Sequence, residues 1–409
     1  MEEVREILKQ YNQEQLLTFY DKMGITDKEK LLNQILEIDF EKIFGLYKNA
    51  NKKFEMGNCD VKPIDYIDKE KLSKQDIEKY YNIGKSVIEQ GKIAVITMAG
   101  GQGTRLGHTG PKGTFDIGLD SHKSIFGILC DIFIKAKKDF NKSINWYIMT
   151  SEDNDRDTRQ FFKENNYFGY DCENIIFFKQ GQFPVISEDG KLLLDENGFV
   201  KQAPNGHGGI FQNLRKNGIL DDMKNKGIQW VFVSGVDNIL VKPIDPIFIG
   251  ASISKNVLIA GKSLVKAYPE EKVGVFCLRN GRPSVIEYTE VTDEMANLKT
   301  EDGELAYGES HIICNMFSVE AIERLVDFEL PYHVAHKKIV YMNEKGEIVK
   351  PESPNAYKFE GFIFDTFPEF DDMLIFRVKR EEEFAPIKNK EGQDSPETAR
   401  KLYTDFMKK

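Results

Sequence analysis

The segment Ile93–Thr114 constrains the fold of this chain more than any other, because it joins an apolar strand directly to a glycine-rich turn. It reads IAVITMAGGQGTRLGHTGPKGT, and the glycines of its turn include Gly100, Gly101, Gly103 and Gly107. Glycine adopts positive φ angles and lets a ligand approach the backbone closely. The N–H groups of such a turn can bind a polyphosphate, and Arg105 and Lys112 add positive charge within reach of it. The segment therefore predicts a phosphate-binding loop at the end of a strand.

The spacing of this loop excludes two commoner phosphate-binding motifs. A P-loop requires G-x-x-x-x-G-K-[ST], whereas the lysine of this loop stands between a proline and a glycine. A dinucleotide-binding fingerprint requires G-x-G-x-x-G, whereas Gly101, Gly103 and Gly107 are spaced one residue too far. A tight turn without a ligand is the alternative interpretation. Several glycines together with Arg105 and Lys112 favour phosphate binding over that alternative.

The composition predicts a globular protein of more than one domain. The chain has 409 residues, 41% of them hydrophobic, which predicts two or three domains with a sizeable core. Its net charge of −10 argues against nucleic acid or an anionic membrane as a partner. No apolar run approaches the ~20 residues of a membrane span, and the charged start MEEVREILKQ lacks the apolar region of a signal peptide. Five scattered cysteines without a C-x-x-C pair fit a reducing compartment, so we expect a cytoplasmic protein.

The character of the chain changes at about residue 92. Residues 1–92 carry apolar residues at helical spacing, as in LLNQILEIDFEKIF, and predict a helical region that packs on the main domain. From residue 93 onwards, short β-rich runs alternate with helical stretches, which predicts an α/β sheet with ligands at the carboxyl ends of its strands. We expect this core over 93–388 and a short C-terminal segment over 389–409. The predicted strands are IAVITM, NWYIMT, NIIFFKQ, QWVFVSG, NVLIAGKSLV, VIEYTEV, FIFDTF and MLIFRV.

A second candidate site is the tripeptide VDN, which follows the predicted strand QWVFVSG. Its Asp237 stands at the carboxyl end of that strand. A carboxylate beside a polyphosphate is suited to Mg²⁺, which prefers hard oxygen ligands. The alternative is an Asx turn before Asn238. Asp365 in FIFDTF occupies a similar position in another predicted strand.

The loop AGGQGTRLG, followed by PKG, resembles the signature loop of the UDP-sugar pyrophosphorylases, above all that of the eukaryotic-type UDP-N-acetylglucosamine pyrophosphorylases. The resemblance continues over most of the chain through KQGQFPVI, APNGHGGIF, SGVDNILVKPIDPIFIG, VGVFC, VIEYTEV, CNMF, YHVAHKKI, KFEGFIFDTF and REEEFAPIKN. It implies a Rossmann-like nucleotidyltransferase core with a mixed central sheet. It also implies an enzyme that makes UDP-N-acetylglucosamine and pyrophosphate from UTP and N-acetylglucosamine 1-phosphate.

Matching positions imply roles for individual residues. Those for UTP are Met98, Gly100, Gly101, Lys112, Gln180 and Gly206. Those for the sugar are His207, Gly274, Glu287, Tyr288, Asn315, Phe362 and Phe364. The candidate ligands for Mg²⁺, for which Mn²⁺ can substitute, are Asp237 and Asp365. The candidate catalytic cations are Arg105, Lys112 and Lys388, the last of which matches a lysine that approaches the phosphate of the sugar.

Some of these residues have a simpler interpretation when the resemblance is set aside. Phe362 and Phe364 would then be a pair on one side of a core strand, and Lys388 an ordinary surface lysine. His207 points to another sugar, because N-acetylglucosamine enzymes usually have Asn in a G-N-G-G context. A G-H-G sequence is closer to the UDP-glucose and broad-specificity UDP-sugar pyrophosphorylases, which is the alternative function.

Two other classes of protein fit the sequence less well. A glycosyltransferase of related fold would carry a D-x-D metal motif, which VDN does not supply. A non-catalytic nucleotide-sugar-binding protein would be expected to lose Arg105 or the metal carboxylates, and all of them are present. The oligomeric state and the order of substrate binding are left open by the sequence.

The implied chemistry is a single in-line displacement at the α-phosphorus of UTP. The attacking phosphate oxygen of the sugar 1-phosphate is already an anion, so neither a general base nor a covalent protein nucleophile is required. The protein has to position two anions that repel each other and to stabilise the charge on the leaving pyrophosphate.

Overall fold

The computed structural model describes residues 1–50 and 59–408, which form two compact units. The first unit comprises 1–50, 181–209 and 329–363, and the second comprises 59–180, 210–328 and 364–408. The chain therefore leaves the second unit and returns to it twice. The segments 1–92, 93–388 and 389–409 expected from the sequence divide the chain differently, and as a domain division they stay a prediction.

The second unit is built on a mixed β-sheet, as predicted. The strands of this sheet are β1 (Val61–Pro63), β2 (Tyr66–Asp68), β3 (Ile93–Met98), β4 (Asn145–Thr150), β5 (Ile175–Lys179), β9 (Trp230–Gly235), β10 (Ile259–Val265), β11 (Val275–Arg279), β12 (Arg282–Ile286), β13 (Glu309–Ser318) and β18 (Leu374–Arg377). The main order is β2-β18-β10-β13-β9-β3-β4-β5, with β1, β11 and β12 attached beside β13. Strands β5, β4, β3 and β9 are parallel, whereas β13 runs antiparallel to β9 and β10.

Long apolar runs predicted most of these strands correctly. IAVITM, NWYIMT, QWVFVSG and MLIFRV contain β3, β4, β9 and β18, and NIIFFKQ and NVLIAGKSLV contain β5 and β10. Strand β3 is buried at every position, as expected for a parallel strand that is covered on both faces. In VIEYTEV, only the first two residues belong to a strand, β12.

The run FIFDTF is not a strand, and that prediction is wrong. Ile363–Glu369 form the 3₁₀-helix η8, in which Ile363, Phe364 and Phe367 are buried. These buried residues recur at i, i+1 and i+4, which is helical spacing. Asp365 therefore lies within a 3₁₀-helix and not at the end of a strand.

Of residues 1–92, the structure describes 1–50 and 59–92, and these are mostly helical, as predicted, but not throughout. Their helices are α1 (Glu2–Gln10), η1 (Glu14–Leu17), η2 (Tyr20–Lys22), α2 (Ile25–Leu36), α3 (Phe40–Asn49), η3 (Lys69–Lys71) and α4 (Lys74–Glu89). Strands β1 and β2 interrupt them and pair with β11 and β18 in the sheet of the second unit. A strand of three residues has no periodicity to recognise, so its pairing with distant strands decides its conformation.

Side-chain caps mark the start of two long helices of the second unit, α5 and α9. Ser124 accepts a hydrogen bond from Gly127 N–H at the start of α5, and Asp245 accepts one from Ile247 N–H at the start of α9. Pro246 stands at the first position of α9, where no N–H partner is needed. The helices of the second unit beyond α4 are η4 (Thr104–Leu106), η5 (Lys112–Thr114), α5 (Ile125–Phe140), α6 (Asp155–Glu164), η6 (Asn166–Gly169), η7 (Cys172–Asn174), α7 (Ile210–Lys216), α8 (Ile219–Asn225), α9 (Pro246–Ser254), α10 (Asp293–Asn297), α11 (Val319–Leu325), α12 (Arg380–Glu383) and α13 (Pro396–Met407), together with η8.

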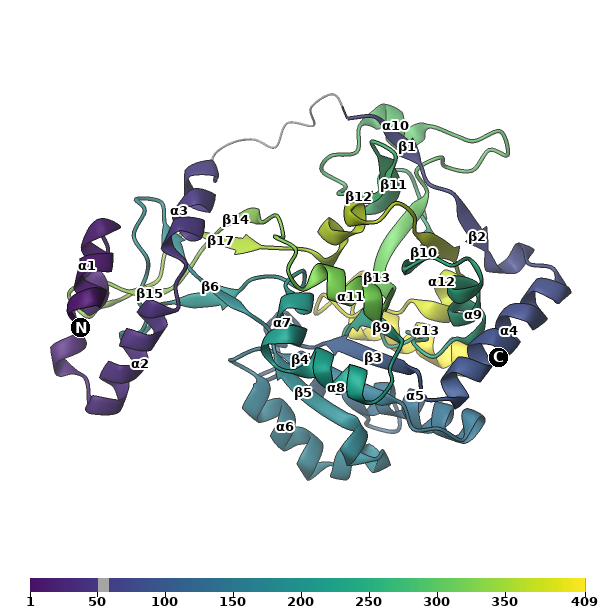
Figure 1. Cartoon of the computed structure of the whole chain (residues 1–409), viewed down its shortest axis with the longest axis horizontal. Helices are drawn as coiled ribbons and strands as arrows, with labels where there is room; N and C mark the ends of the chain where they lie inside the picture. Colours follow the sequence, from purple (N-terminus) through teal and green to yellow (C-terminus); the bar gives the residue numbers. More distant parts are fainter. Residues whose placement is uncertain (51–58, 409) are drawn as a thin grey trace. The chain divides into compact units, whose positions relative to one another are not determined.

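Helices α4 and α9 touch backbone to backbone (Figure 1). A Cβ atom on Gly84 would lie 2.0 Å from the carbonyl oxygen of Pro246. A Cβ atom on Gly250 would lie 1.8 Å from the carbonyl oxygen of Tyr80. Both distances are far below van der Waals contact, so the crossing of these two helices depends on glycine at both positions.

We expect Gly250→Ala to lower the free energy of unfolding by roughly 1–3 kcal/mol, because the added methyl group must push α4 away. Gly45 in α3 is a matched control, since a Cβ atom there would meet nothing within 4 Å. Gly45→Ala should instead stabilise the protein by about 0.5–1 kcal/mol through helix propensity. Urea unfolding measures both, and a Gly250→Ala protein as stable as the wild type would contradict the close crossing.

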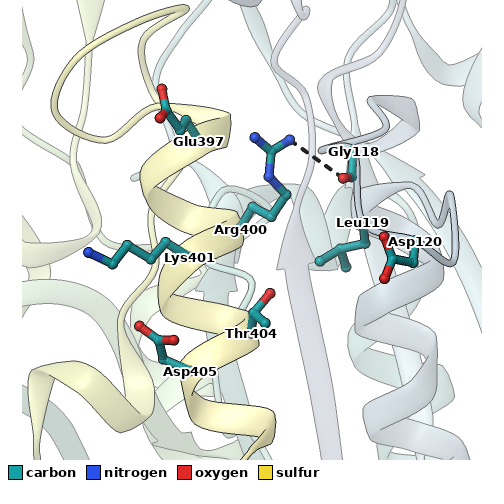
Figure 2. A pocket seen from close by; sticks show the side chains of 8 residues that line it. All are labelled: Gly118, Leu119, Asp120, Glu397, Arg400, Lys401, Thr404 and Asp405. Atoms are coloured by element: carbon teal, nitrogen blue, oxygen red, sulfur yellow. Dashed lines mark hydrogen bonds between the residues drawn. The ribbon is translucent and has the colours of Figure 1, made fainter.

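The C-terminal helix α13 packs beside the turn that follows the glycine-rich loop (Figure 2). It begins with a capping box between Ser395 and Thr398. Arg400 donates hydrogen bonds to the carbonyl oxygens of Ile117 at 3.1 Å and Gly118 at 3.5 Å. The cavity beside this contact measures about 390 Å³ and is lined by Gly118, Leu119, Asp120, Glu397, Arg400, Lys401, Thr404 and Asp405. None of the site residues predicted from the sequence lines it, so this cavity is separate from the predicted site.

The first unit combines helices α1 to α3 with short strands. Its core packs helical residues such as Leu8 and Ile35 against strand residues such as Ile186 and Phe359, all nearly inaccessible to solvent. The strands form the sheets β14-β17-β7, β15-β16 and β6-β8. Their bounds are β6 (Gln182–Pro184), β7 (Ile186–Ser187), β8 (Gln202–Pro204), β14 (His333–Lys337), β15 (Tyr341–Met342), β16 (Ile348–Val349) and β17 (Ala356–Glu360).

Two further features concern the cysteines and the helices of the chain. All five cysteines are free thiols, and burial raises the pKa of Cys130, Cys277 and Cys314 to about 12. These three thiols therefore stay protonated at neutral pH. Across residues 1–50 and 59–408, no helix has the length and apolar character needed to cross a membrane.

Candidate functional site

The glycine-rich loop closes on itself immediately after β3. Lys112 N–H donates to Gly101 O at 3.0 Å, and Gly103 N–H donates to Gly110 O at 2.9 Å. Between these bonds the chain forms the short helix η4, which ends at Gly107 with a φ of 73°. A left-handed conformation of this kind favours glycine, which explains the glycine at this position. Arg105 thus lies in η4 within the closed loop, and Lys112 makes its closing hydrogen bond.

Two amide side chains lie directly against the loop. The fully buried Asn154, which follows β4, donates from Nδ2 to Ala99 O at 2.9 Å and to Gly101 O at 3.3 Å. Gln180, which follows β5, covers Gly100 so closely that a Cβ atom there would lie 2.6 Å from its Nε2. Beside Gly101, in contrast, a Cβ atom would meet nothing within 4 Å. The structure therefore brings together Gly100, Gly101 and Gln180, as the sequence predicted, and adds Asn154, which the sequence analysis missed.

The predicted catalytic residues form one electrostatic cluster around Lys112. Burial lowers the pKa of Lys112 below its ordinary value, and Asp237 acts in the opposite direction. Lys388 and Arg105 lower the pKa of Lys112 further. Arg105 is exposed, and the Lys388 side chain is 49% exposed. Arg105 from the same loop, and Asp237 and Lys388 from distant parts of the sequence, thus lie close enough to Lys112 to act on its charge. A polyanion bound there would stabilise the protonated lysine.

Asp237 stands two residues beyond the end of β9, as predicted. The loop that carries it is tied to the end of β3, because Val236 N–H donates to Met98 O at 3.1 Å. Its carboxylate turns back over Gly235, where a Cβ atom would lie 2.6 Å from Asp237 Oδ1. The Asx turn in this tripeptide is made by Asn238, whose Oδ1 accepts from Leu240 N–H at 3.2 Å. The carboxylate of Asp237 therefore takes no part in that turn.

Asp237 is the carboxylate at the cation cluster that could bind Mg²⁺. Within the described residues, no group of three or more His, Cys, Asp or Glu side chains is arranged to hold a metal ion. Mg²⁺ bound together with a nucleotide usually takes only one or two carboxylates, and the substrate phosphates and water complete its shell. Asp237 at the cation cluster fits this pattern. Asp365 is partly buried in η8 and not at a strand end, so its role as the second ligand stays a prediction.

Most predicted sugar-binding residues of the second unit fall into two small clusters. In the first, a Cβ atom on Gly274 would lie 3.4 Å from Glu287 Oε1, so the carboxylate covers this glycine. Tyr288, the next residue, is 47% exposed. In the second cluster, the fully buried Asn315 on β13 pairs with Gly261 on β10.

His311 holds the amide of Asn315 and was missed by the sequence analysis. Its Nε2 lies 3.3 Å from Asn315 Oδ1 and 3.2 Å from Asn315 Nδ2. The ring of His311 meets the ring of Phe364 edge to face, with centroids 5.7 Å apart. The structure therefore brings Asn315 and Phe364 together around a histidine. The signal in the sequence was weak, since His311 is only one of several polar residues in β13.

The remaining predicted residues meet in the first unit. Gly206 has a φ of 84°, and a Cβ atom on it would lie 2.2 Å from Gly361 O. The next residue, His207, accepts a hydrogen bond at Nδ1 from Ile363 N–H at 3.2 Å. Its ring lies 5.5 Å from that of Phe362. Gly206 is thus required by the close approach of the backbone at Gly361, and His207 and Phe362 form an aromatic pair.

Comparison with known proteins adds independent information. A family model described as UTP–glucose-1-phosphate uridylyltransferase matches residues 39–393. The UDP-N-acetylglucosamine diphosphorylase 2 of Arabidopsis thaliana is 36% identical over 97% of this chain and 82% of its own length. The UDP-N-acetylglucosamine pyrophosphorylase of Saccharomyces cerevisiae is 36% identical over 98% of this chain and 89% of its own length.

A solved structure agrees in fold. The uridine diphosphate N-acetylglucosamine pyrophosphorylase of Trypanosoma brucei, crystallised with an inhibitor, superposes with a TM-score of 0.81. It is 30% identical and covers 97% of this chain and 82% of its own. The resemblance found in the sequence is thereby confirmed. This chain belongs to the UTP–glucose-1-phosphate uridylyltransferase family, the family of the UDP-sugar pyrophosphorylases.

Proposed function

We propose that this chain is a uridylyltransferase that converts UTP and N-acetylglucosamine 1-phosphate into UDP-N-acetylglucosamine and pyrophosphate. The observation that carries the proposal is the cluster of Lys112, Arg105, Lys388 and Asp237 beside the glycine-rich loop. A site with three cations and one carboxylate suits two substrates that are both phosphate anions. We further propose that the protein works in the cytoplasm, independently of nucleic acid and membranes.

In this proposal the loop and its neighbours hold UTP. Gln180 offers uracil a donor and an acceptor on one amide, and its position over Gly100 supports that role. The open space beside Gly101 leaves room for a phosphate close to the backbone. Met98 and Gly206 complete the nucleotide contacts.

The reaction is a displacement at the α-phosphorus of UTP. A phosphate oxygen of the sugar 1-phosphate forms the new bond to this phosphorus, and the bond to the bridging oxygen of pyrophosphate breaks. Lys112 and Arg105 stabilise the charge that builds on the leaving pyrophosphate, and Lys388 orients the attacking phosphate. One phosphoanhydride replaces another, so the reaction runs in both directions.

Mg²⁺ is proposed as the metal cofactor, with Mn²⁺ as a substitute. Asp237 and Asp365 would hold it, and it would neutralise charge on the phosphates. Burial lowers the pKa of Lys112, and Asp237 opposes that lowering, which favours the protonated lysine that the leaving group needs.

We expect N-acetylglucosamine 1-phosphate to be preferred over glucose 1-phosphate by a factor of about ten to a few hundred, or roughly 1–3 kcal/mol. Asn315, Phe362 and Phe364 are the residues proposed to contact the acetamido group. Pyrophosphate release from UTP with a panel of sugar 1-phosphates measures the ratio of kcat/KM values.

His207 provides the internal comparison for this assay. His207→Asn should keep activity with the N-acetyl sugar and sharpen the discrimination. Should the wild type instead have the higher kcat/KM with glucose 1-phosphate, the chain would be a UDP-glucose or broad-specificity UDP-sugar pyrophosphorylase with the same chemistry.

A further inference from the structure

A buried network of charges lies behind the loop that carries Asp237. Lys262 on β10 is inaccessible to solvent, and its Nζ lies 2.6 Å from Glu383 and 3.2 Å from Asp245. The same ammonium donates to Lys242 O at 3.1 Å. Lys69 approaches the two carboxylates from the other side, at 3.0 Å from Asp245 and 3.4 Å from Glu383. Two cations and two anions thus satisfy one another in the interior of the second unit.

Such a network has an energetic cost. Removing charged groups from water is expensive, and a buried ion pair often contributes less stability than apolar residues of the same size. Burial alone would lower the pKa of Lys262, but Glu383 and Asp245 outweigh it, so the pKa is raised. Lys262 therefore stays protonated at neutral pH. The network instead fixes the positions of its side chains, because each charge holds its partners in place.

Asn238 connects this network to the proposed site. Its Nδ2 donates to the carbonyl oxygen of Glu383 at 2.7 Å. Its Oδ1 accepts from Ala385 N–H at 2.9 Å. Ile387 N–H then donates to Asp237 O at 3.0 Å. The segment from Glu383 to Ile387 is thereby fastened along the loop that carries Asp237, and the next residue of that segment is Lys388.

We propose that Asn238 and the Lys262–Glu383 pair are positioning residues that fix the distance between the carboxylate of Asp237 and the ammonium of Lys388. The proposal rests on the proposed function, in which these two groups act on the same pair of substrates. Neither Asn238 nor the ion pair needs to touch a substrate for this role. The hydrogen bonds of Asn238 span 145 and 147 residues of sequence, so it joins segments that the chain itself does not connect closely.

The effect of loosening this connection follows from the geometry of displacement reactions. A misplacement of about 1 Å in a reacting pair can cost roughly a hundredfold in rate. Asn238→Ala should accordingly lower kcat by about ten- to a hundredfold. Binding of UTP without metal should stay within about twofold of the wild type, because the glycine-rich loop is held separately by Asn154.

The test combines kinetics with two readouts that do not depend on turnover. Binding of Mn²⁺ in the presence of UTP, followed by electron paramagnetic resonance, should weaken about tenfold in Asn238→Ala if Asp237 is displaced. Hydrogen exchange at the amides of Ala385 and Ile387 should become faster, because Asn238 no longer holds their segment. Unchanged kcat and unchanged Mn²⁺ affinity in a folded Asn238→Ala protein would overturn the proposal, even if its melting temperature fell.

Tyr170→Phe is the matched control for a structural effect alone. The Tyr170 hydroxyl is also buried and also joins distant backbone groups, since it accepts from Ile144 N–H at 2.7 Å and donates to Ile144 O at 2.8 Å. Ile144 precedes β4, at the opposite end of the strands from the proposed site. Tyr170→Phe should lower stability without changing kcat or Mn²⁺ binding. If it changed them as much as Asn238→Ala does, the effect would be general loosening and the proposal would be wrong.

Glu383→Gln provides a second variant if Asn238→Ala does not fold. It keeps the carbonyl oxygen that Asn238 binds and removes the charge that faces Lys262 and Lys69. Its kcat and Mn²⁺ affinity should fall in the same direction, by a smaller factor; wild-type values for both would overturn the role of the ion pair. A wild-type protein that forms no UDP-sugar would refute the proposed function instead, while Mn²⁺ binding and hydrogen exchange would still decide the positioning role.

Discussion

Replacing Lys112 by methionine is expected to lower kcat by roughly 10²- to 10³-fold, about 2.7–4 kcal/mol, and at the same time to stabilise the protein without ligands. The loss in rate follows because Lys112 is the least exposed member of the cation cluster, and Arg105, the other cation proposed to act on the leaving pyrophosphate, is exposed to water. The gain in stability, roughly 0.5–2 kcal/mol, follows because burial and the neighbouring cations disfavour its charge. Steady-state kinetics and urea unfolding measure the two effects.

The stability effect has a defined dependence on pH. The folded protein binds the proton of Lys112 less tightly than the unfolded chain does, since the pKa of Lys112 is lowered on folding. The gain from Lys112→Met should therefore be constant below the folded-state pKa. It should shrink as the pH rises from that value towards about 10.4, the pKa of lysine in the unfolded chain.

Lys135→Met is the control for this pair of effects, since the Lys135 side chain is 75% exposed on α5 and pairs with Asp139 one turn away. It should change neither rate nor stability appreciably. A Lys112→Met enzyme with near-normal turnover would contradict the role given to Lys112. If Lys112→Met instead lowered the free energy of unfolding, the conclusion that the charge of Lys112 is unfavourable in the folded protein would be wrong.

The second large effect concerns Asp237. Asp237→Asn keeps the size of the side chain and removes its charge, and we expect kcat to fall by about a thousandfold, which corresponds to about 4 kcal/mol. Binding of UTP in metal-free buffer should be retained, because the charge removed is a negative one. Mn²⁺ binding in the presence of UTP should weaken strongly.

Asp365→Asn tests the other half of the metal proposal. If Asp365 is the second ligand, its substitution should reproduce the loss of Mn²⁺ binding. If Mn²⁺ binding is unchanged in this variant, Asp237 holds the metal without it. Full activity of the wild type after treatment with EDTA would refute the metal requirement altogether.

The sequence predicted the core of the fold because its strands are long apolar runs. IAVITM and QWVFVSG are buried over most of their length. Short apolar runs that are rich in β-branched and aromatic residues favour a buried strand over a helix. Strands β1 and β2 were missed because three residues carry no period, and only pairing with β11 and β18 makes them strands. FIFDTF was misread because alternating aromatic residues imitate a strand, whereas the buried positions follow a helical spacing.

The residues of the site divide in the same way, into those that a local motif reveals and those whose contacts are distant in the sequence. Arg105 and Lys112 were found because they belong to one short motif, and Asp237 because it follows a strand directly. Asn154 was missed because its partner Ala99 lies 55 residues away. Asn238 was noticed only as a turn residue, since its bond to Ala385 spans 147 residues. A residue whose function is to join distant segments leaves no local pattern that the sequence can reveal.

The most direct test of the account is the stereochemistry of transfer. The wild-type protein would be given one stereoisomer of UTP with sulfur on its α-phosphorus, together with N-acetylglucosamine 1-phosphate, and the products followed by phosphorus NMR. A single displacement that uses Arg105, Lys112 and Lys388 without a protein nucleophile predicts one UDP-sugar and one pyrophosphate per turnover, with inverted configuration at that phosphorus. Retention of configuration, or the absence of any UDP-sugar, would contradict the account.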